Sequence, residues 1–270
     1  MEHMCAPPVP RVKDLPLSGI ESDLVNALLH DLGRPDAVVE QVVAGERFIA
    51  VVAGGRVGLS SLLGARPSEG EKGLAENAVG RTVDQVAQCL LRPSPFAICL
   101  GMAALNAANA PDPDAVTGGD ASAEALITEL GRGRTVGLVG EFPFVDALRE
   151  KVGTLHLFEL RDVPGAIPPD RWEEVLSGLD VLAVTGTALL TRQMGYYLTR
   201  ARRAVSVVLG PTTPLSRVLF GFGADYLCGS VVIDPVRVLE GARAGLPFRA
   251  VKRGGGIRFV RIAREDGLSK

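Results

Sequence analysis

The feature that most constrains this fold is the alternation of short apolar runs with amphipathic segments in the second half of the chain. The apolar runs occupy residues 135–139, 155–159, 181–185 and 205–209, and a segment of helical character lies between consecutive runs. Continuous Val, Leu and Ile between helices are typical of parallel strands that are covered on both faces. The sequence therefore predicts an α/β fold built on a doubly wound, mostly parallel sheet.

The other elements of this half follow from the same pattern. Helices are predicted at residues 122–130, 142–151, 171–177, 189–202 and 237–244. A last short strand and its exit are expected at residues 225–228 and 231–233. The tail contains three consecutive glycines, and we predict a terminal hairpin that turns across residues 254–256.

The first third of the chain has a different pattern. Ser18 and Glu21 have the spacing of a capping box, and apolar residues follow at helical spacing as far as Leu32. Three β-rich runs come next, at residues 38–44, 47–53 and 56–63. Because glycine-containing turns separate these runs, we predict a three-stranded antiparallel meander.

Two further helices are predicted before the middle of the chain. Thr82 and Gln85 resemble a second capping box, which opens a helix that continues to Leu91. Residues 96–110 are nearly all apolar or small, as in a helix buried inside a protein or between two domains. Asn106 is one of the two strongly polar residues in it; it either braces the following loop or faces a ligand cleft.

Length and composition favour two domains. A chain of 270 residues with 47% hydrophobic content can bury one large core or two modest ones. Residues 111–120 combine two prolines, two glycines and three aspartates, which is typical of a linker. We therefore predict a small α+β domain at residues 1–112 and a Rossmann-like domain at residues 113–270.

The charge balance argues against two classes of partner. The chain has 29 basic and 31 acidic residues and a net charge of -2, so it has no electrostatic footprint for nucleic acid or an anionic membrane. It has no apolar run long enough to span a bilayer, and residues 1–10 lack the apolar stretch of a signal peptide. We expect a cytoplasmic protein, and a homodimer is the commonest assembly for such a chain.

No spacing of cysteines or histidines predicts a metal site. The residues concerned are Cys5, Cys89, Cys99, Cys228, His3, His30 and His156. They lie far apart, and none forms the paired spacing of a zinc site or a disulfide framework. The cysteines are expected to be reduced thiols, and His156, inside a predicted strand, is more typical of a core histidine than of a general base. Metal ligands stay unknown at this stage.

The loops after the parallel strands are the expected ligand site, because ligands of open parallel sheets bind outside the carboxyl ends of the strands. The candidate contacts are Gly137, Gly140, Glu141, Phe142, Glu159, Thr185, Gly186, Thr187, Gly210, Pro211 and Thr212. The two glycines at the first strand lack a full G-x-G-x-x-G pattern. The Thr and Gly loops could cradle a carboxylate or phosphate, although ordinary turn chemistry would select the same residues.

Glu159 is the candidate with the most specific spacing. It follows Gly140 by 19 positions, close to the spacing at which an acidic residue binds the ribose hydroxyls of a nucleotide. The alternative is an ordinary surface ion pair with Arg161 or Arg171. S-adenosylmethionine or another nucleotide-like ligand is therefore a possible cofactor.

Several motifs resemble those of one family. They are LGMAALNA with Gly101 and Asn106, TVGLVGEFP with Gly140 and Pro143, FEL with Glu159, DVLAVTGTAL with Asp180, VVLGPTTPLS with Gly210, and FGFGADYLCGSVVIDP with Gly223, Gly229 and Asp234. Together they resemble the putative heavy-metal chelation family, in which an enolase-N-terminal-like domain precedes a Rossmann-like domain. The sequence departs from the family pattern at Ala188, where relatives tend to carry Thr, and at Arg217, where Pro is usual.

The resemblance implies an active site in a cleft between the two domains. It also implies condensation, hydrolysis or group transfer in the synthesis or handling of a metal-chelating metabolite. Asn106 and Asp234 are the candidate catalytic side chains. The alternatives are an S-adenosylmethionine-dependent transferase and a non-catalytic protein that binds a heavy metal or a metal chelate. No catalytic triad, P-loop or HExxH motif is present to fix the reaction.

Overall fold

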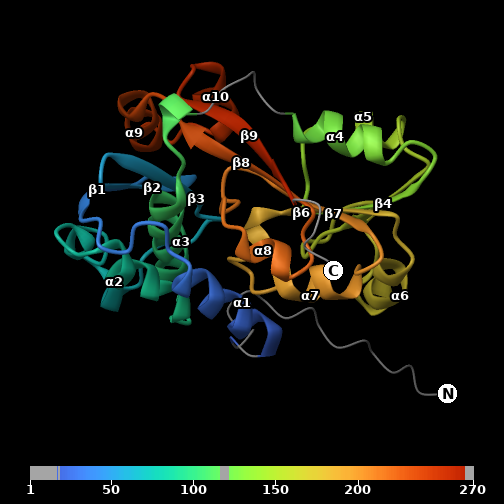
Figure 1. Cartoon of the computed structure of the whole chain (residues 1–270), viewed down its shortest axis with the longest axis horizontal. Coiled ribbons are helices and arrows are strands. Elements are labelled where there is room, and N and C mark those ends of the chain that lie inside the picture. Colours follow the sequence, from blue (N-terminus) through green and yellow to red (C-terminus); the bar gives the residue numbers. More distant parts are fainter. Residues whose placement is uncertain (1–16, 18, 116–121, 265–270) are drawn as a thin grey trace.

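The computed structural model describes residues 17, 19–115 and 122–264, and it is an α/β protein with two separate sheets (Figure 1). The first sheet is an antiparallel meander of β1 (Val39–Ala44), β2 (Phe48–Ala53) and β3 (Arg56–Ser61), as predicted. Helix α1 (Gly19–His30) precedes it, and Ser18 of the predicted capping box lies outside the described residues. The linker predicted at residues 111–120 is also described only in part.

The helices α2 (Val83–Ala87) and α3 (Pro95–Asn109) complete the first part of the chain. Thr82 caps α2 and exchanges hydrogen bonds with Gln85, which confirms the predicted capping box. Helix α3 is buried along almost its whole length and packs on β3. A Cβ atom at Gly58 would lie 2.1 Å from the Ala103 carbonyl oxygen, so only glycine permits this approach.

The second sheet has six strands in the order β5-β4-β6-β7-β8-β9. The strands are β4 (Thr135–Val139), β5 (Thr154–Phe158), β6 (Val181–Thr185), β7 (Val205–Leu209), β8 (Tyr226–Val232) and β9 (Ile257–Ala263). The first five are parallel and β9 is antiparallel, so the predicted mostly parallel sheet is confirmed. The strand order reverses between β4 and β6, which makes their carboxyl ends the topological switch point.

Helices cover both faces of this sheet. They are α4 (Ala123–Leu130), α5 (Val145–Arg149), α6 (Trp172–Ser177), α7 (Met194–Arg200) and α8 (Val218–Gly221). The last two helices, α9 (Pro235–Arg243) and α10 (Phe248–Arg253), lie between β8 and β9 along the chain. The α4 and α5 helices pack on one face, and α6, α7 and α8 pack on the other (Figure 1). Successive residues of β6 contribute to the two sides: Val181 and Ala183 to one and Leu182 and Val184 to the other.

The prediction of a hairpin in the tail is wrong. Its expected first strand is helix α10, whose Phe248 ring stacks on Phe48 at 4.6 Å between ring centroids and whose Val251 is buried. The glycines that follow lead into β9, which pairs with β8 along its whole length. Packing against the first sheet therefore outweighs the local β pattern, and β9 covers an edge that β8 would otherwise expose.

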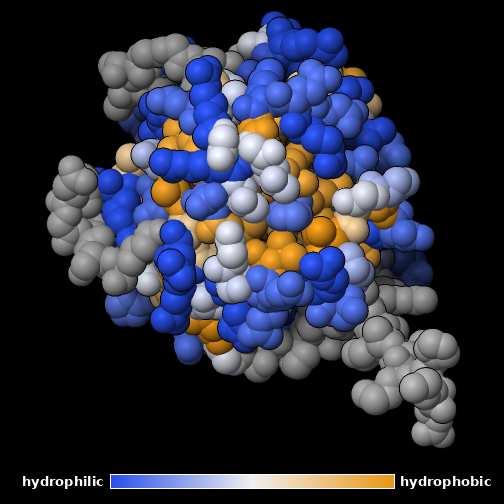
Figure 2. All heavy atoms as spheres, turned by 90° about the vertical axis from the view of Figure 1, so that its right-hand side faces the viewer, coloured by the Kyte–Doolittle hydropathy of each residue, from blue (hydrophilic) through white to orange (hydrophobic). Residues whose placement is uncertain are grey.

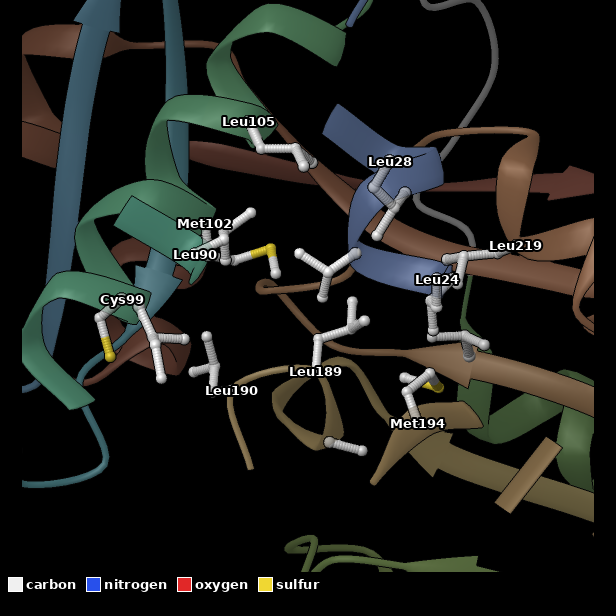
Figure 3. Close-up of a cluster of buried hydrophobic side chains, with 14 of the residues drawn as sticks. Leu24, Leu28, Leu90, Cys99, Met102, Leu105, Leu189, Leu190, Met194 and Leu219 are labelled. Carbon is white, nitrogen blue, oxygen red and sulfur yellow. The ribbon is translucent and has the colours of Figure 1, made fainter. Parts of the chain in front are cut away.

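The two parts of the chain share one hydrophobic core. Figure 3 shows Leu24 and Leu28 of α1, Met102 and Leu105 of α3, and Leu189 and Met194 of the segment after β6 gathered in one cluster. The other face of the first sheet packs on α9 and α10, through Phe48 and Leu59 against Val238 and Val251. The meander is therefore held between α3 and the last two helices.

The face on the right of Figure 1 carries a band of apolar side chains across its middle, surrounded by hydrophilic ones (Figure 2). Among the described residues, no helix is long and apolar enough to cross a membrane.

Candidate ligand-binding site

A cavity of about 550 Å³ lies at the carboxyl ends of β4, β5 and β6. The loops after these strands supply Gly140, Glu141, Phe142, Glu159, Arg161, Thr185 and Thr187 to its lining. Thr191, Gln193 and Tyr197 line it from the segment that enters α7, and Leu63 lines it from the loop after β3. Its volume is within the usual range for a site that binds a small organic molecule. The cavity also lies at the switch point of the sheet, which is where open parallel sheets usually bind their ligands.

Gly140 shapes the loop that leaves β4. It has a φ of 94°, which favours glycine, and its N–H donates to the Phe158 carbonyl oxygen at 2.9 Å. A Cβ atom there would lie 3.1 Å from Cγ2 of Thr185. The positive φ of the turn therefore favours glycine at this position, and the approach of β6 leaves little room for a side chain.

Glu159 is the most heavily hydrogen-bonded side chain of the cavity. Its Oε1 accepts from the N–H groups of Leu160 (2.9 Å) and Arg161 (3.2 Å), and its Oε2 accepts from the N–H of Glu141 (3.2 Å). The Arg161 guanidinium donates to both oxygens and also reaches Glu141 at 3.0 Å. Burial raises the pKa of Glu159, but the hydrogen bonds and charge of Arg161 lower the pKa by more, so the net shift is downward. Glu159 is therefore an anion at neutral pH.

Glu159 has features of both roles considered for it, the ion pair and the ligand contact. The carboxylate forms the ion pair with Arg161, and only 11% of its side chain is exposed, yet it also lines the cavity. Arg161 is 67% exposed. The guanidinium is therefore largely in solvent and is held by its hydrogen bonds to Glu159 and Glu141.

Hydroxyl groups form the opposite wall. The side-chain oxygens of Thr185 and Thr187 lie 2.9 Å apart, and Thr191 donates to the Ala188 carbonyl oxygen at 3.3 Å. Tyr197 is 1% exposed, and burial raises the pKa of its phenol, so the hydroxyl stays protonated. The wall thus offers both donors and acceptors to a polar ligand.

Six of the predicted contacts lie together and five do not. Those that line the cavity are Gly140, Glu141, Phe142, Glu159, Thr185 and Thr187. Gly137 is inside β4, where a Cβ atom would lie 2.3 Å from Cδ1 of Leu179, and Gly186 packs against Thr213. Their role in the described structure is close packing.

The loop of Gly210, Pro211 and Thr212 instead joins the two parts of the chain. The Thr212 Oγ1 accepts from the N–H of Ser61 at 3.0 Å. The Asn106 Nδ2 donates to the carbonyl oxygens of Leu59 (2.7 Å) and Thr212 (3.1 Å). Asn106 therefore braces β3 against this loop.

The two candidate catalytic residues lie away from the Glu159 cavity. Asn106 lines a separate small cavity of about 10 Å³, with Thr213 and Ser230, and its Oδ1 has no partner among the described residues. That space is about the size of one water molecule. Asp234 caps α9 by accepting from the N–H of Arg237 at 3.0 Å.

Leu63, Gln193 and Tyr197 were not predicted. Leu63 comes from the other part of the chain, and Tyr197 belonged to a predicted helix with no polar pattern that marks a site. The helix predicted at residues 189–202 is α7 alone, because Arg192 has a φ of 55° that interrupts it and turns Gln193 toward the cavity. The sequence Arg192-Gln193 contains no glycine or proline that would predict this break in the helix.

The described residues do not fit a directly bound heavy metal. Among residues 17, 19–115 and 122–264, no three His, Cys, Asp or Glu side chains are close enough to hold one ion. Cys89, Cys99 and Cys228 are buried and free, and burial raises the pKa of Cys99 to about 12 and that of Cys228 to about 11. Heavy metals are held by several thiolate or imidazole ligands together, and the described side chains form no such group. Cys5 lies outside the described residues.

Comparison with known proteins identifies related sequences and structures. The model of the DUF364 family, described as "Putative heavy-metal chelation", matches residues 123–261, and the DUF4213 model, with the same description, matches residues 25–109. A crystal structure of a DUF364 protein with unknown function from Desulfitobacterium hafniense is 25% identical, with a TM-score of 0.78 over 90% of this chain and 98% of that chain. One from Pyrococcus horikoshii is 17% identical, with a TM-score of 0.72 over 91% and 100%. No curated protein sequence matches.

Proposed function

Because the chain belongs to the DUF364 family, described as "Putative heavy-metal chelation", we propose that it binds and transforms a polar small molecule in the Glu159 cavity. The reaction is condensation, hydrolysis or group transfer in the synthesis or handling of a metal-chelating metabolite. Any metal arrives with that metabolite, since the described side chains provide no donor set of their own. The ligand supplies the metal-binding oxygens or nitrogens.

The observation that carries the proposal is the position of the ionised Glu159 at the switch point of the sheet. A buried carboxylate accepts strong hydrogen bonds from neighbouring hydroxyl groups on a ligand. Both of its oxygens already accept from Arg161, so ligand hydroxyls would take the place of the guanidinium donors. Arg161 would keep its ion pair with Glu141, at 3.0 Å, on the rim of the cavity.

Carboxylates are the acid–base groups that this cavity offers. Glu141 and Glu159 both line it, and the Thr185, Thr187 and Tyr197 hydroxyls can orient a carbonyl or hydroxyl group of the ligand. A general base is most effective when its pKa is close to the operating pH, and the lowered pKa of Glu159 makes it a weaker base than a free carboxylate. Glu159 therefore binds and orients the ligand as an anion.

A second candidate function is that of an S-adenosylmethionine-dependent transferase. It is favoured by the arrangement of the Gly140 turn and Glu159 at the ends of adjacent strands, since this is where nucleotide-binding sheets hold a ribose. The α5 helix after Gly140 has only five residues and begins at Val145. A pyrophosphate is usually held by the first turn of a helix directly after the glycine loop, so a nucleoside without a pyrophosphate is the better match.

A thermal-shift screen tests both functions. The purified protein is heated with S-adenosylmethionine, its demethylated product, nucleosides, pterins and divalent metals, and the screen is repeated with Glu159→Gln. A ligand at a hundredfold excess over its dissociation constant stabilises the folded protein by about 2.7 kcal/mol. Glu173→Gln is the matched control, because Glu173 makes a surface ion pair with Arg200 at 3.0 Å and is 72% exposed.

The outcomes separate the candidates. A ligand that stabilises the wild type and Glu173→Gln, but not Glu159→Gln, supports the proposed cavity. If that ligand is S-adenosylmethionine, the transferase is favoured. Stabilisation by metal ions alone, equal in all three proteins, would contradict the proposal and favour a non-catalytic metal-binding protein.

A further inference from the structure

A second cavity adjoins the Glu159 cavity and shares one residue with it. This second cavity has a volume of about 430 Å³, and Leu63 lines both. Arg47 and Arg66 line it from the loops of the first sheet, and Phe248 lines it from α10. The two spaces therefore meet at a single leucine, at the junction between the two parts of the chain.

The two arginines of the second cavity are exposed, and the acidic residue in its lining is Glu46. The Arg47 Nε donates to the Gly245 carbonyl oxygen, and the Arg66 Nη1 donates to the Glu46 carbonyl oxygen, each at 3.2 Å. Neither guanidinium forms an ion pair with a residue that the structure describes. Their remaining N–H groups are free to donate, and guanidinium groups bind carboxylate and phosphate with paired hydrogen bonds.

The charges of the two cavities are of opposite sign. The second cavity has two arginines and one carboxylate, Glu46. The Glu159 cavity has the reverse, with two glutamates and Arg161. A molecule that spans both would be held best with its hydroxyl groups beside Glu159 and an anionic group beside the arginines.

Leu63, which lines both cavities, has an unusual backbone conformation. Its φ is 49° and its exposure is 55%, and Gly64 follows with a φ of 80°. The turn is fixed by hydrogen bonds from the Leu62 N–H to the Arg47 carbonyl and from the Ala65 N–H to the Leu62 carbonyl. Left-handed backbone is strained for a leucine, whereas glycine adopts it freely. The turn itself does not require this side chain, and the Leu63 side chain is available for an apolar contact because it lines both cavities.

We propose that Arg47 and Arg66 form a subsite for the anionic group, carboxylate or phosphate, of an elongated ligand whose other end lies beside Glu159. The middle of this ligand crosses Leu63. The inference rests on the proposed function for the end of the ligand that lies beside Glu159. The anion subsite itself can be tested without it, because the arginines lie outside the Glu159 cavity.

The test measures anion binding to the full chain with citrate and inorganic phosphate as probes. Melting temperatures are recorded at constant ionic strength for the wild type, Arg47→Gln/Arg66→Gln and Glu159→Gln. Arg132→Gln/Arg134→Gln is the matched control, since these exposed arginines precede β4 at the opposite end of the strands. General salt stabilisation affects all four proteins equally, so the differences between them report the site.

We expect both probes to raise the melting temperature of the wild type, Glu159→Gln and the control variant. In Arg47→Gln/Arg66→Gln the affinity should fall at least about tenfold, as for the loss of hydrogen bonds to a charged group. A stronger response to citrate than to phosphate identifies a carboxylate, and the reverse identifies a phosphate. An equal response in all four proteins would overturn the subsite.

A second arm distinguishes failure of the subsite from failure of the proposed function. Adenosine and adenosine monophosphate are compared as neutral and anionic probes by calorimetry. Loss of the advantage of the monophosphate in Arg47→Gln/Arg66→Gln alone supports the spanning ligand. If the probes bind at the arginines while the Glu159→Gln variant binds all of them as well as the wild type does, the result supports the subsite and contradicts the proposed ligand of the Glu159 cavity. If the monophosphate keeps its advantage in the arginine variant, the spanning ligand is rejected.

Discussion

Leu63 has a backbone conformation that suits glycine better than leucine, with a φ of 49° and a side chain that is 55% exposed. We predict that Leu63→Gly keeps or raises the free energy of unfolding, by up to about 1 kcal/mol, because the strain is removed and little packing is lost. The same change should lower the binding affinity of any ligand that occupies the two cavities. Urea denaturation and calorimetry measure the two effects.

The control for Leu63 is Leu91→Gly. Leu91 is also exposed, at 40%, but it ends a 3-10 helix and has no positive φ. Glycine should therefore destabilise the protein there by about 1 kcal/mol. A similar loss of stability at both positions would show that the Leu63 side chain contributes to packing, and would weaken its assignment to a ligand.

Asn106 gives a second prediction at this scale. Asn106→Ala leaves the carbonyl groups of Leu59 and Thr212 without their donor, so the free energy of unfolding should fall by about 2–4 kcal/mol. Asn26→Ala, on the exposed side of α1, should change it by less than about 0.5 kcal/mol. Unchanged stability with lost activity would instead support the catalytic role inferred from the sequence.

Sequence reasoning could predict which residues lie together in the cavity where their position depends only on local order. Glu159, Thr185 and Thr187 lie at or just after the carboxyl ends of buried strands, and the carboxyl-end rule for parallel sheets is enough to bring them together. Leu63 depends on how two distant parts of the chain pack. No local pattern marks such a contact, so sequence alone could not place it in the cavity.

At the scale of elements, Glu21 attaches α1 to the start of α7. Its carboxylate is 8% exposed and accepts from the N–H of Tyr196 at 2.8 Å. Burial raises the pKa of Glu21 above its ordinary value, despite the hydrogen bonds from Tyr196 and Gly195. A carboxyl group with a raised folded-state pKa favours the folded protein at low pH, and this contribution is lost as the pH rises through that pKa.

We therefore predict a pH-dependent effect of Glu21→Gln. Glutamine keeps an acceptor oxygen and carries no charge, so its stability relative to the wild type should be lowest near pH 4 and should increase toward pH 7. Urea denaturation at several pH values measures the difference, and Glu124→Gln in an exposed pair with Lys151 is the control. A difference that does not vary with pH would contradict the raised pKa.

The strands were predicted more accurately than the helices around them. The β4, β6 and β7 strands have the predicted bounds, because continuous apolar residues between turns leave few alternatives. The α5 and α7 helices are shorter than predicted, and α10 replaces a predicted strand. These errors occur where contacts such as that of Phe248 with Phe48 decide the conformation.

At the scale of the whole molecule, the shared core predicts a single unfolding transition. Leu24, Met102 and Leu189 pack in one cluster, although they come from distant parts of the chain (Figure 3). The fluorescence of Trp172, the only tryptophan, reports on the second sheet, and circular dichroism reports on all helices and strands. Their urea transitions should coincide, as expected for one cooperative unit.

The same reasoning predicts that residues 122–270 do not fold alone. Without the first part of the chain, the apolar surfaces of α7, α8 and α9 that α1 and the first sheet cover would be exposed to water. Two separated transitions, or a fragment with the native fluorescence of Trp172, would show that the parts are independent. That result would support the prediction of two domains at residues 1–112 and 113–270.

The packing of α1 and α3 against Leu189 and Met194 also has a consequence for how the two segments of the chain evolve. Two family models recognise separate segments of this chain, yet a substitution in one segment of the core changes the shape that the other must fit. A gene that exchanged one segment with a distant relative would combine two mismatched surfaces. The two segments should therefore pass from ancestor to descendant as a pair, and chimeras should recover their stability only through compensating substitutions at this junction.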